Sequence, residues 1–360
     1  MQTKYVDNKQ THSTLGILNT LDKTGSYIKD ISFSDTLSMF GKTFYPLGSQ
    51  SIIVMRFDAN GNYKWGITLK AQGMVTLEDM VSDDSCNITV IGDYEGKMQL
   101  PNAQIFDTLQ YNMQGYIIKF DSSGNIIWAK NHHYSSSGFT FKIINDKQGN
   151  LYFSTVAAFA FELAHDSAFF LSSSFAIVKF DRGGNIVLYK RIKPYSGNIA
   201  VSDNGKFIYL FSFMVGKSTY IYDKDTLVNP NPKYNYILSA YDDKGDNIYH
   251  RMLTANVHDG YEDLAYKNMY VDDVGNCYFT YRHSGILVEA GRTFYTAPLS
   301  YPDPVWMKID INRNIIWAVS GTDSTSSGFA GLMDTIATGI IYTHFRTKQD
   351  SRINNIIIKF

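Results

Sequence analysis

The sequence predicts an all-β protein built from tandem repeats, and three observations carry this prediction. A short motif, Asp-x-x-Gly-Asn in its fullest form, recurs between apolar runs. Its copies begin at Asp58, Asp121, Asp181, Asp242 and Asp310, at intervals of 63, 60, 61 and 68 residues. A second, similar turn lies between successive copies. An interval of about sixty residues that holds two turns indicates one supersecondary unit per repeat.

Each copy of the motif is predicted to be the turn of a β-hairpin. The runs before it, such as 52–55 and 116–118, are rich in β-branched and aromatic residues, which suit a buried pleated strand. The Asp side chain can bond the backbone two residues further on, and the Gly can adopt the positive φ that closes a type I turn with a bulge. The run after the turn ends in a large side chain, which is Trp65, Trp128, Leu188, Tyr249 or Trp317.

The second turn supplies another hairpin in each repeat. Its copies lie at residues 21–27, 82–87, 145–152, 202–205 and 272–278. Two hairpins make four antiparallel strands, and tandem four-stranded units of this size are the blades of a β-propeller.

Taken in order, the repeats cover nearly the whole chain. The predicted blades one to four span about residues 15–70, 74–131, 139–194 and 198–254. Blade five follows a longer connection at 250–268, which accounts for the interval of 68, and blade six is the weakest match. A segment of blade one, 37–45, has an echo in blade five at 288–295, which supports the register independently of the turns.

The alternation of Asp-x-x-Gly-Asn-x-x-Trp with Asp-x-x-Gly-Asn-x-Tyr resembles the SBBP-type repeats of bacterial β-propeller proteins. Such repeats are common in secreted and surface proteins, so the resemblance implies an extracellular or cell-surface protein. It implies no catalytic residues, because that family shares none. The blades here are more irregular than in a typical array, since Leu188 and Tyr249 replace the Trp and Asp246 replaces the turn Asn.

The two ends of the chain predict how the last blade is completed. Residues 356–360 match the third strand of a blade, and 2–6 match a fourth strand with Tyr5 in place of the Trp. We therefore expect residues 1–8 to pair with 355–360 and to close a six-bladed propeller, a single domain over 1–360, because an open ring would expose a sheet edge. The alternative is a piece cut from a longer array.

Composition excludes some classes of function. The chain has 44% hydrophobic and 19% charged residues and a formal net charge of −1, whereas nucleic-acid binders carry a basic excess. No run of 18 apolar residues predicts a membrane span. Cys86 and Cys277 fall in blades expected nearly opposite each other, so no disulfide is predicted. The first residues lack the apolar core of a signal peptide, which leaves a mature extracellular form, a virion protein or a cytoplasmic one open.

Two patterns of charged residues, the Asp turns and a series of basic residues, could suggest a bound ligand. Both are better explained without one. The turn 58–62 resembles half of a calcium loop but lacks the distant bidentate Glu, so we predict a turn and no metal or cofactor. A basic residue recurs at one position, just before the end of the third strand, in five copies: Arg56, Lys119, Lys179, Lys308 and Lys359. This ladder could form a ring, but alternation beside apolar neighbours favours a solvated strand face, paired locally to the Asp turns.

The candidate binding residues lie in two connections between blades. Those connections, and the loops between the second and third strands, are expected at the mouth of the central channel. The predicted pocket residues are His132, His133, Tyr134, His258, Asp259, Tyr261 and Glu262. The alternative is that they are ordinary polar loop residues.

No nucleophile elbow, His-Glu-x-x-His motif or P-loop is present in the sequence. The prediction is therefore a non-catalytic binding module or scaffold that contacts a protein or glycan partner on a cell or virion surface. Two alternatives are a polysaccharide lyase or hydrolase with its site at the channel mouth, and a structural component of a larger assembly.

Overall fold

The computed structural model describes most of the 360 residues. The described ranges are 13–106, 113–134, 140–156, 159–160, 175–192, 197–214, 218–222, 225–229, 234–257, 269–283, 285–289, 292–297, 303–320, 329–336, 340–346 and 353–359. Within them the chain is all-β, as predicted, and every pair of strands whose register is given is antiparallel. The described ranges contain no helix, and thus none long and apolar enough to cross a membrane.

The chain divides into two compact units, which are described in turn. The first holds residues 1–173 and 178–187, and the second holds 174–177 and 188–360. The expectation of a single domain over 1–360 stays a prediction.

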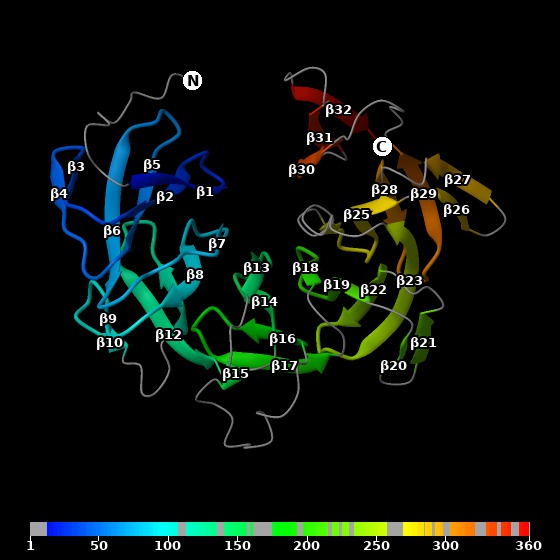
Figure 1. Ribbon diagram of the computed structural model, residues 1–360, viewed down its shortest axis with the longest axis horizontal. Helices are drawn as coiled ribbons and strands as arrows, with labels where there is room; N and C mark the ends of the chain where they lie inside the picture. Colours follow the sequence, from blue (N-terminus) through cyan, green and yellow to red (C-terminus); the bar gives the residue numbers. More distant parts are fainter. Residues whose placement is uncertain are drawn as a thin grey trace. The chain divides into compact units, whose positions relative to one another are not determined.

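The first unit contains the first two repeats and most of the third (Figure 1). Repeat one consists of β1 (Ser13–Leu21), β2 (Tyr27–Phe33), β5 (Ser51–Phe57) and β6 (Tyr63–Ala71). Repeat two consists of β7 (Asp79–Ser82), β8 (Ile88–Tyr94), β11 (Gln114–Phe120) and β12 (Ile126–Tyr134). Repeat three consists of β13 (Thr140–Asn145), β14 (Leu151–Val156), β16 (Phe175–Phe180) and β17 (Ile186–Ile192). The strands of each repeat are neighbours in sequence order.

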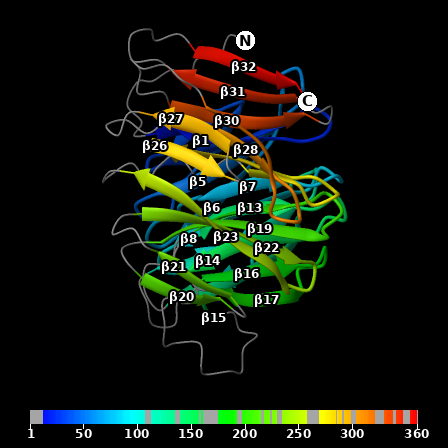
Figure 2. The same ribbon diagram turned by 90° about the vertical axis from the view of Figure 1, so that its right-hand side faces the viewer.

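The second unit contains the later repeats. Repeat four consists of β18 (Gly197–Val201), β19 (Phe207–Met214), β22 (Tyr234–Asp242) and β23 (Asn247–Val257). Repeat five consists of β24 (Met269–Val271), β25 (Cys277–His283), β28 (Asp303–Ile309) and β29 (Ile315–Ser320). Repeat six has β30 (Phe329–Ile336), β31 (Ile340–Arg346) and β32 (Ile353–Lys359), which lie side by side (Figure 2).

The predicted four-stranded antiparallel units are therefore confirmed for five repeats. In the sixth repeat three strands are described. Residues 1–8, the expected fourth strand, lie outside the described residues, so the closure of the last blade stays a prediction.

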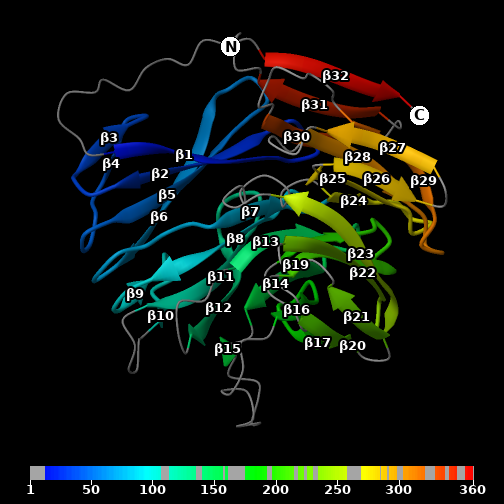
Figure 3. The same ribbon diagram turned by 45° about the vertical axis from the view of Figure 1, so that its right-hand side comes forward.

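Short strands occupy the connection between the second and third strands of a repeat. They are β3 (Leu37–Met39), β4 (Lys42–Phe44), β9 (Met98–Gln99), β10 (Ile105–Phe106), β15 (Phe159–Ala160), β20 (Ser218–Tyr222), β21 (Asp225–Asn229), β26 (Gly285–Glu289) and β27 (Arg292–Ala297). The two echoing segments form the hairpins β3–β4 and β26–β27. In the first unit β9 instead pairs with β6 of the preceding repeat (Figure 3), and β15 pairs with β12.

The Asp turns have the predicted chemistry. Asp121 Oδ1 accepts the backbone N–H groups of Ser123 and Asn125, each at 2.8 Å, and its Oδ2 accepts the side-chain amide of Asn125 at 2.9 Å. Gly124 has φ +89°, and its N–H bonds the carbonyl of Asp121 at 3.0 Å. In the calcium-like turn the backbone and side-chain N–H groups of Asn62 hold the pKa of Asp58 well below its ordinary value. These carboxylates are thus turn residues, as the sequence predicted.

Three turns place a side chain where the others have glycine. Cys86, Ala103 and Arg313 have φ of 60°, 67° and 72°, a left-handed conformation that costs an L-residue roughly 1–2 kcal/mol. Ala103 is exposed and closes a turn in which its N–H bonds the carbonyl of Leu100 at 3.0 Å.

Ala103→Gly is expected to stabilise the protein by about 0.5–1 kcal/mol. The gain is the released backbone strain, reduced by the larger conformational freedom of glycine in the unfolded chain. The free energy of unfolding in urea measures it. Exposed Ala59 provides the control, because it is not among the positive-φ residues and Ala59→Gly should be neutral or destabilising. A destabilised Ala103→Gly would contradict the prediction.

The two larger cores lie between neighbouring repeats. In the first unit, Ile52 and Val54 of β5 cluster with Val90 of β8 and Ile118 of β11. In the second unit, residues of β19 and β22 cluster with residues of β25 and β28. A four-stranded sheet here buries both faces, so each repeat depends on its neighbours for its core, as expected of a repeat array.

Candidate functional site

The predicted pocket residues fall in two different situations. His132, His133 and Tyr134 are the last residues of β12, so the sequence was wrong to place them in a loop. They form a strand because β11 pairs on one side, with Gln114 opposite His133, and β15 adds on the other, with Ala160 opposite His133. The remaining candidates, His258, Asp259, Tyr261 and Glu262, lie outside the described residues. That the two groups line one pocket stays a prediction.

Two residues of the basic ladder, Arg56 and Lys119, are buried, so the expectation of a solvated face was wrong for these two. Lys119 Nζ lies 2.9 Å from Asp83 Oδ2, and both side chains are 2% exposed. The same ammonium group donates to the carbonyl of Gly149, in the corresponding turn of repeat three, at 3.4 Å. Lys119 thus pairs with the Asp turn of its own repeat and bonds the turn of the next one. We call this arrangement the turn bolt.

Repeat one has the same turn bolt with an arginine. Arg56 forms an ion pair with Asp22, and its Nη1 donates to the carbonyl of Cys86, in the turn of repeat two, at 3.3 Å. The expected pairing of the ladder with the Asp turns is therefore confirmed for these two residues. The guanidinium also reaches the carbonyl of Ser122 at 3.0 Å.

In repeats three and five a tyrosine lies between the ladder lysine and the Asp of the turn. Lys179 lies 4.9 Å from the ring centre of Tyr152, whose hydroxyl donates to Asp146 at 3.0 Å. Lys308 and Tyr278 repeat this arrangement at the same ring distance, with a hydroxyl bond to Asp272 of 3.3 Å. A cation over an aromatic ring is stabilised electrostatically, so each of these half-buried ammonium groups keeps a partner.

Repeat four has lost both charges together. Ser202 stands in the Asp position and Ala240 in the ladder position, where it pairs across the strands with Tyr209. The buried Tyr209 hydroxyl donates to the carbonyl of Gly275, in the turn of repeat five, at 2.7 Å. A neutral donor on the second strand therefore makes the bond that Lys119 makes from the third. The same contact between repeats is achieved with an ion pair or without one.

The turn bolt predicts an acid-sensitive step in stability. Burial alone raises the pKa of Asp83, but bonds from Lys119 and Asn87 outweigh it and leave the pKa below the ordinary 3.8. A carboxyl with a lowered folded-state pKa stabilises the protein above its unfolded pKa, and this contribution is lost as the pH falls through the folded value. We expect the free-energy difference between wild type and Asp83→Asn to shrink as the pH falls from about 5 to about 2.

Urea unfolding at a series of pH values measures this difference. Asp84→Asn is the matched control, because Asp84 is exposed in the same turn. An Asp83→Asn deficit that is constant over the whole range would contradict the assignment.

The large residue at the end of the motif forms a second contact between repeats. Trp65 Nε1 donates to the carbonyl of Ser122 at 3.0 Å, and Trp128 Nε1 donates to the carbonyl of Arg182 at 3.1 Å. Both acceptors directly follow the Asp of the next repeat's turn. In repeat four, Tyr249 lies at the same place with Arg313 over its ring at 5.8 Å. The tryptophan position is thus a docking residue for the following turn.

One buried tyrosine of the first unit, Tyr116, has a perturbed pKa. Burial raises the pKa of the Tyr116 hydroxyl well above its ordinary value, and the nearby carboxylates of Asp93, Glu78 and Asp30 raise it further. The neutral hydroxyl donates to the carbonyl of Thr76 at 2.7 Å.

A neighbouring pair, Lys142 and Asp79, also serves the fold. Burial lowers the pKa of Lys142, which Asp79 partly opposes. Asp79 itself accepts the N–H groups of Met80 at 2.9 Å and Ile143 at 2.8 Å, and so ties β7 to β13. Within the described ranges no three His, Cys, Asp or Glu side chains are placed to hold a metal ion.

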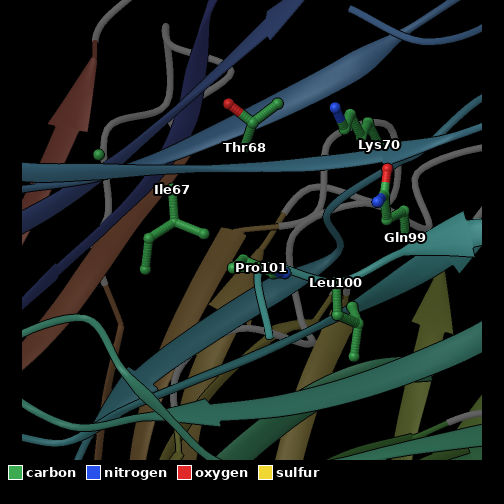
Figure 4. Close-up of a pocket in the computed structure, with 7 residues that line it drawn as sticks. Ile67, Thr68, Lys70, Gln99, Leu100 and Pro101 are labelled. Carbon is green, nitrogen blue, oxygen red and sulfur yellow. The ribbon is translucent and has the colours of Figure 1, made fainter. Parts of the chain in front are cut away.

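An open groove lies along the outer edge of β6 in the first unit (Figure 4). Its volume is about 370 Å³. Four lining residues come from β6 and three from the end of β9 and the turn after it; they are Gly66, Ile67, Thr68, Lys70, Gln99, Leu100 and Pro101. Sequence reasoning missed this groove, because no local pattern shows where β9 joins β6. It is a candidate binding surface within the described residues.

Comparison with known proteins finds similar folds at low similarity. No family model and no curated protein matches the chain. A variant of the Synechocystis apocarotenoid oxygenase is 9% identical with a TM-score of 0.42, over 97% of this chain and 90% of that one. A luciferin-regenerating enzyme is 12% identical with a TM-score of 0.39, over 92% and 83%. A gluconolactonase from Xanthomonas campestris is 11% identical with a TM-score of 0.35, over 93% and 83%.

Proposed function

We propose that the protein is a non-catalytic β-propeller scaffold that presents a rigid surface to a protein or glycan partner on a cell or virion surface. Six blades of the SBBP type, closed by residues 1–8, are part of this proposal. Five repeats that each contain four antiparallel strands support it, as do cores that lie between successive repeats.

The observation that carries the proposal is the use made of buried charge. Asp83 and Lys119 are paired with each other, Asp22 with Arg56, and Asp79 holds two backbone N–H groups. These groups stabilise contacts between repeats. A catalytic acid or base needs a pKa matched to proton transfer and access to substrate. The chemistry of the described interior therefore favours rigidity, which suits a binding surface.

The proposal is tested by measuring binding and turnover on the same samples. The purified protein is mixed with a panel of neutral and acidic polysaccharides, and retention is followed by affinity electrophoresis. The mixtures are then assayed for new reducing ends and for the ultraviolet absorbance of unsaturated uronates. Chemical cross-linking to intact bacterial cells tests for a protein partner.

We expect retention or cross-linking without any new chain ends. Products that accumulate with time and in proportion to protein concentration would replace the proposal with the lyase or hydrolase alternative. Stable incorporation into one large assembly, without free ligand, would favour the structural alternative.

A further inference from the structure

The outer edge of β6 is occupied only at its end. Among the described strands, β6 pairs with β5 along its length and with β9 at two residues, Lys70 opposite Gln99 and Ala71 opposite Met98. The chain then turns away, because Leu100 and Gln104 close a turn with a 2.9 Å backbone bond. Pro101, which has no N–H to donate, stands where the next strand residues would lie. The part of β6 that precedes Lys70, at residues 66–68, therefore lines the groove and pairs with no described strand on its outer side.

The alternation of backbone hydrogen bonds along β6 shows which N–H and C=O groups point to its outer edge. Gln72 N–H bonds the carbonyl of Lys97 at 3.0 Å, on the side of β9. In an antiparallel ladder every second residue directs its N–H and C=O to the same neighbour. Lys70, Thr68 and Gly66 therefore direct theirs to the outer side, and β9 satisfies only Lys70. Thr68 and Gly66 both line the groove, so their backbone groups form part of its wall.

The protein already uses such edges for strand addition. β9 adds to β6, and β15 adds to the same place on β12, where His133 and Tyr134 pair with Ala160 and Phe159. Each added strand has two residues. This edge geometry is therefore compatible with an incoming extended strand.

The positive charge of the groove favours some incoming strands over others. Of its seven lining residues only Lys70 is charged. A lysine at a free edge disfavours pairing with an identical edge, so a second copy of this chain is the less suitable occupant. An acidic side chain on an incoming strand would complement it.

We propose that an extended, acidic segment of a partner protein adds as a strand to β6 at Gly66 and Thr68, in the groove beside Lys70. Main-chain bonds to the two residues provide affinity, and Lys70 provides preference for an acidic side chain. This inference rests on the proposed binding function and names its site and partner class.

The probe is a labelled, acetylated and amidated octapeptide of alternating threonine and valine with a glutamate at each end. A matched peptide carries N-methyl groups on two adjacent central residues, which blocks both edges of the peptide strand. Binding to the full-length protein is measured by fluorescence anisotropy. Hydrogen exchange of the Gly66 and Thr68 amides, with and without peptide, reports the location.

We expect saturable binding of the first peptide, about tenfold weaker binding of the N-methylated one, and slowed exchange at Gly66 and Thr68. Lys70→Glu should weaken binding about tenfold and favour a lysine-ended version of the peptide. Lys206→Glu, the same charge change at an exposed residue outside the groove, should leave binding unchanged. Circular dichroism confirms that both variants fold.

Three results would overturn the inference. They are equal binding of the two peptides, absence of binding at any concentration, and self-association of the protein that Lys70→Glu alters. If the peptide results contradict strand addition at β6 but the protein still binds cells or glycans without cleaving them, the proposed scaffold function stands. If polysaccharide is cleaved, that function falls whatever the peptide does.

Discussion

Lys119→Ala is expected to destabilise the first unit by about 3–5 kcal/mol, the usual cost of leaving a buried charge without its partner. Asp83 would remain, with its side chain 2% exposed. The carbonyl of Gly149 would also lose its donor from repeat two. The loss is measured as the free energy of unfolding in urea, followed by tryptophan fluorescence.

Repeat four supplies the control for this prediction. A triple variant, Lys119→Ala with Asp83→Ser and Thr89→Tyr, copies Ala240, Ser202 and Tyr209, because Thr89 pairs with Lys119 as Tyr209 pairs with Ala240. The new tyrosine is meant to reach Gly149 as Tyr209 reaches Gly275. We expect the triple variant to be more stable than Lys119→Ala, because no charge is left buried.

The outcome distinguishes two explanations of the turn bolt. If charge pairing matters, the triple variant recovers part of the loss, although Lys119→Ala and Asp83→Ser are each destabilising. If the triple variant loses as much unfolding free energy as its three single changes together, the uncharged bond from Tyr209 to Gly275 depends on the surroundings that repeat four provides. In that case the two contacts are not interchangeable.

Gly184→Ala is expected to destabilise the protein by roughly 3 kcal/mol, the sum of backbone strain and overpacking. Gly184 has φ +82°, and an added Cβ would lie 2.8 Å from Cδ2 of Trp128. The indole cannot easily retreat, because its Nε1 bonds the carbonyl of Arg182 at 3.1 Å. One methyl group therefore disturbs both the turn and the contact between repeats.

Gly41→Ala is the matched control for this variant. Gly41 has φ +71°, and nothing lies within 4 Å of the Cβ that alanine would add. Only the backbone strain remains, so we expect a loss of about 1 kcal/mol. Urea unfolding of both variants gives the difference. Equal losses would mean that Trp128 moves aside freely and that its docking adds little to stability.

The turn bolt and the tryptophan contact connect these predictions to function. Both place a side chain of one repeat on the turn of the next, so the repeats support one another through specific bonds as well as apolar packing. Under the proposed function, we expect a surface carried by such repeats to change little on binding. A partner segment then bears most of the ordering cost of association.

The sequence alone determined the local features of this protein. The Asp and Gly of each turn interact within five residues, so their pattern predicts hairpins wherever it occurs. Two hairpins per period then predict four antiparallel strands, which five repeats have. The pairing of Arg56 and Lys119 with Asp turns also follows from the repeat, since both groups recur at the same positions.

Only the tertiary structure decided what those features contact. Lys119 is buried because the turn of repeat three covers it through Gly149, thirty residues further on. His133 and Tyr134 belong to a strand because β15 adds beside them, and β6 has a groove because β9 leaves its edge at Leu100. Turn formation depends on neighbours in sequence, whereas burial and strand edges depend on which distant segments meet. The repeat could therefore be predicted from the sequence, whereas the candidate binding edge of β6 could not.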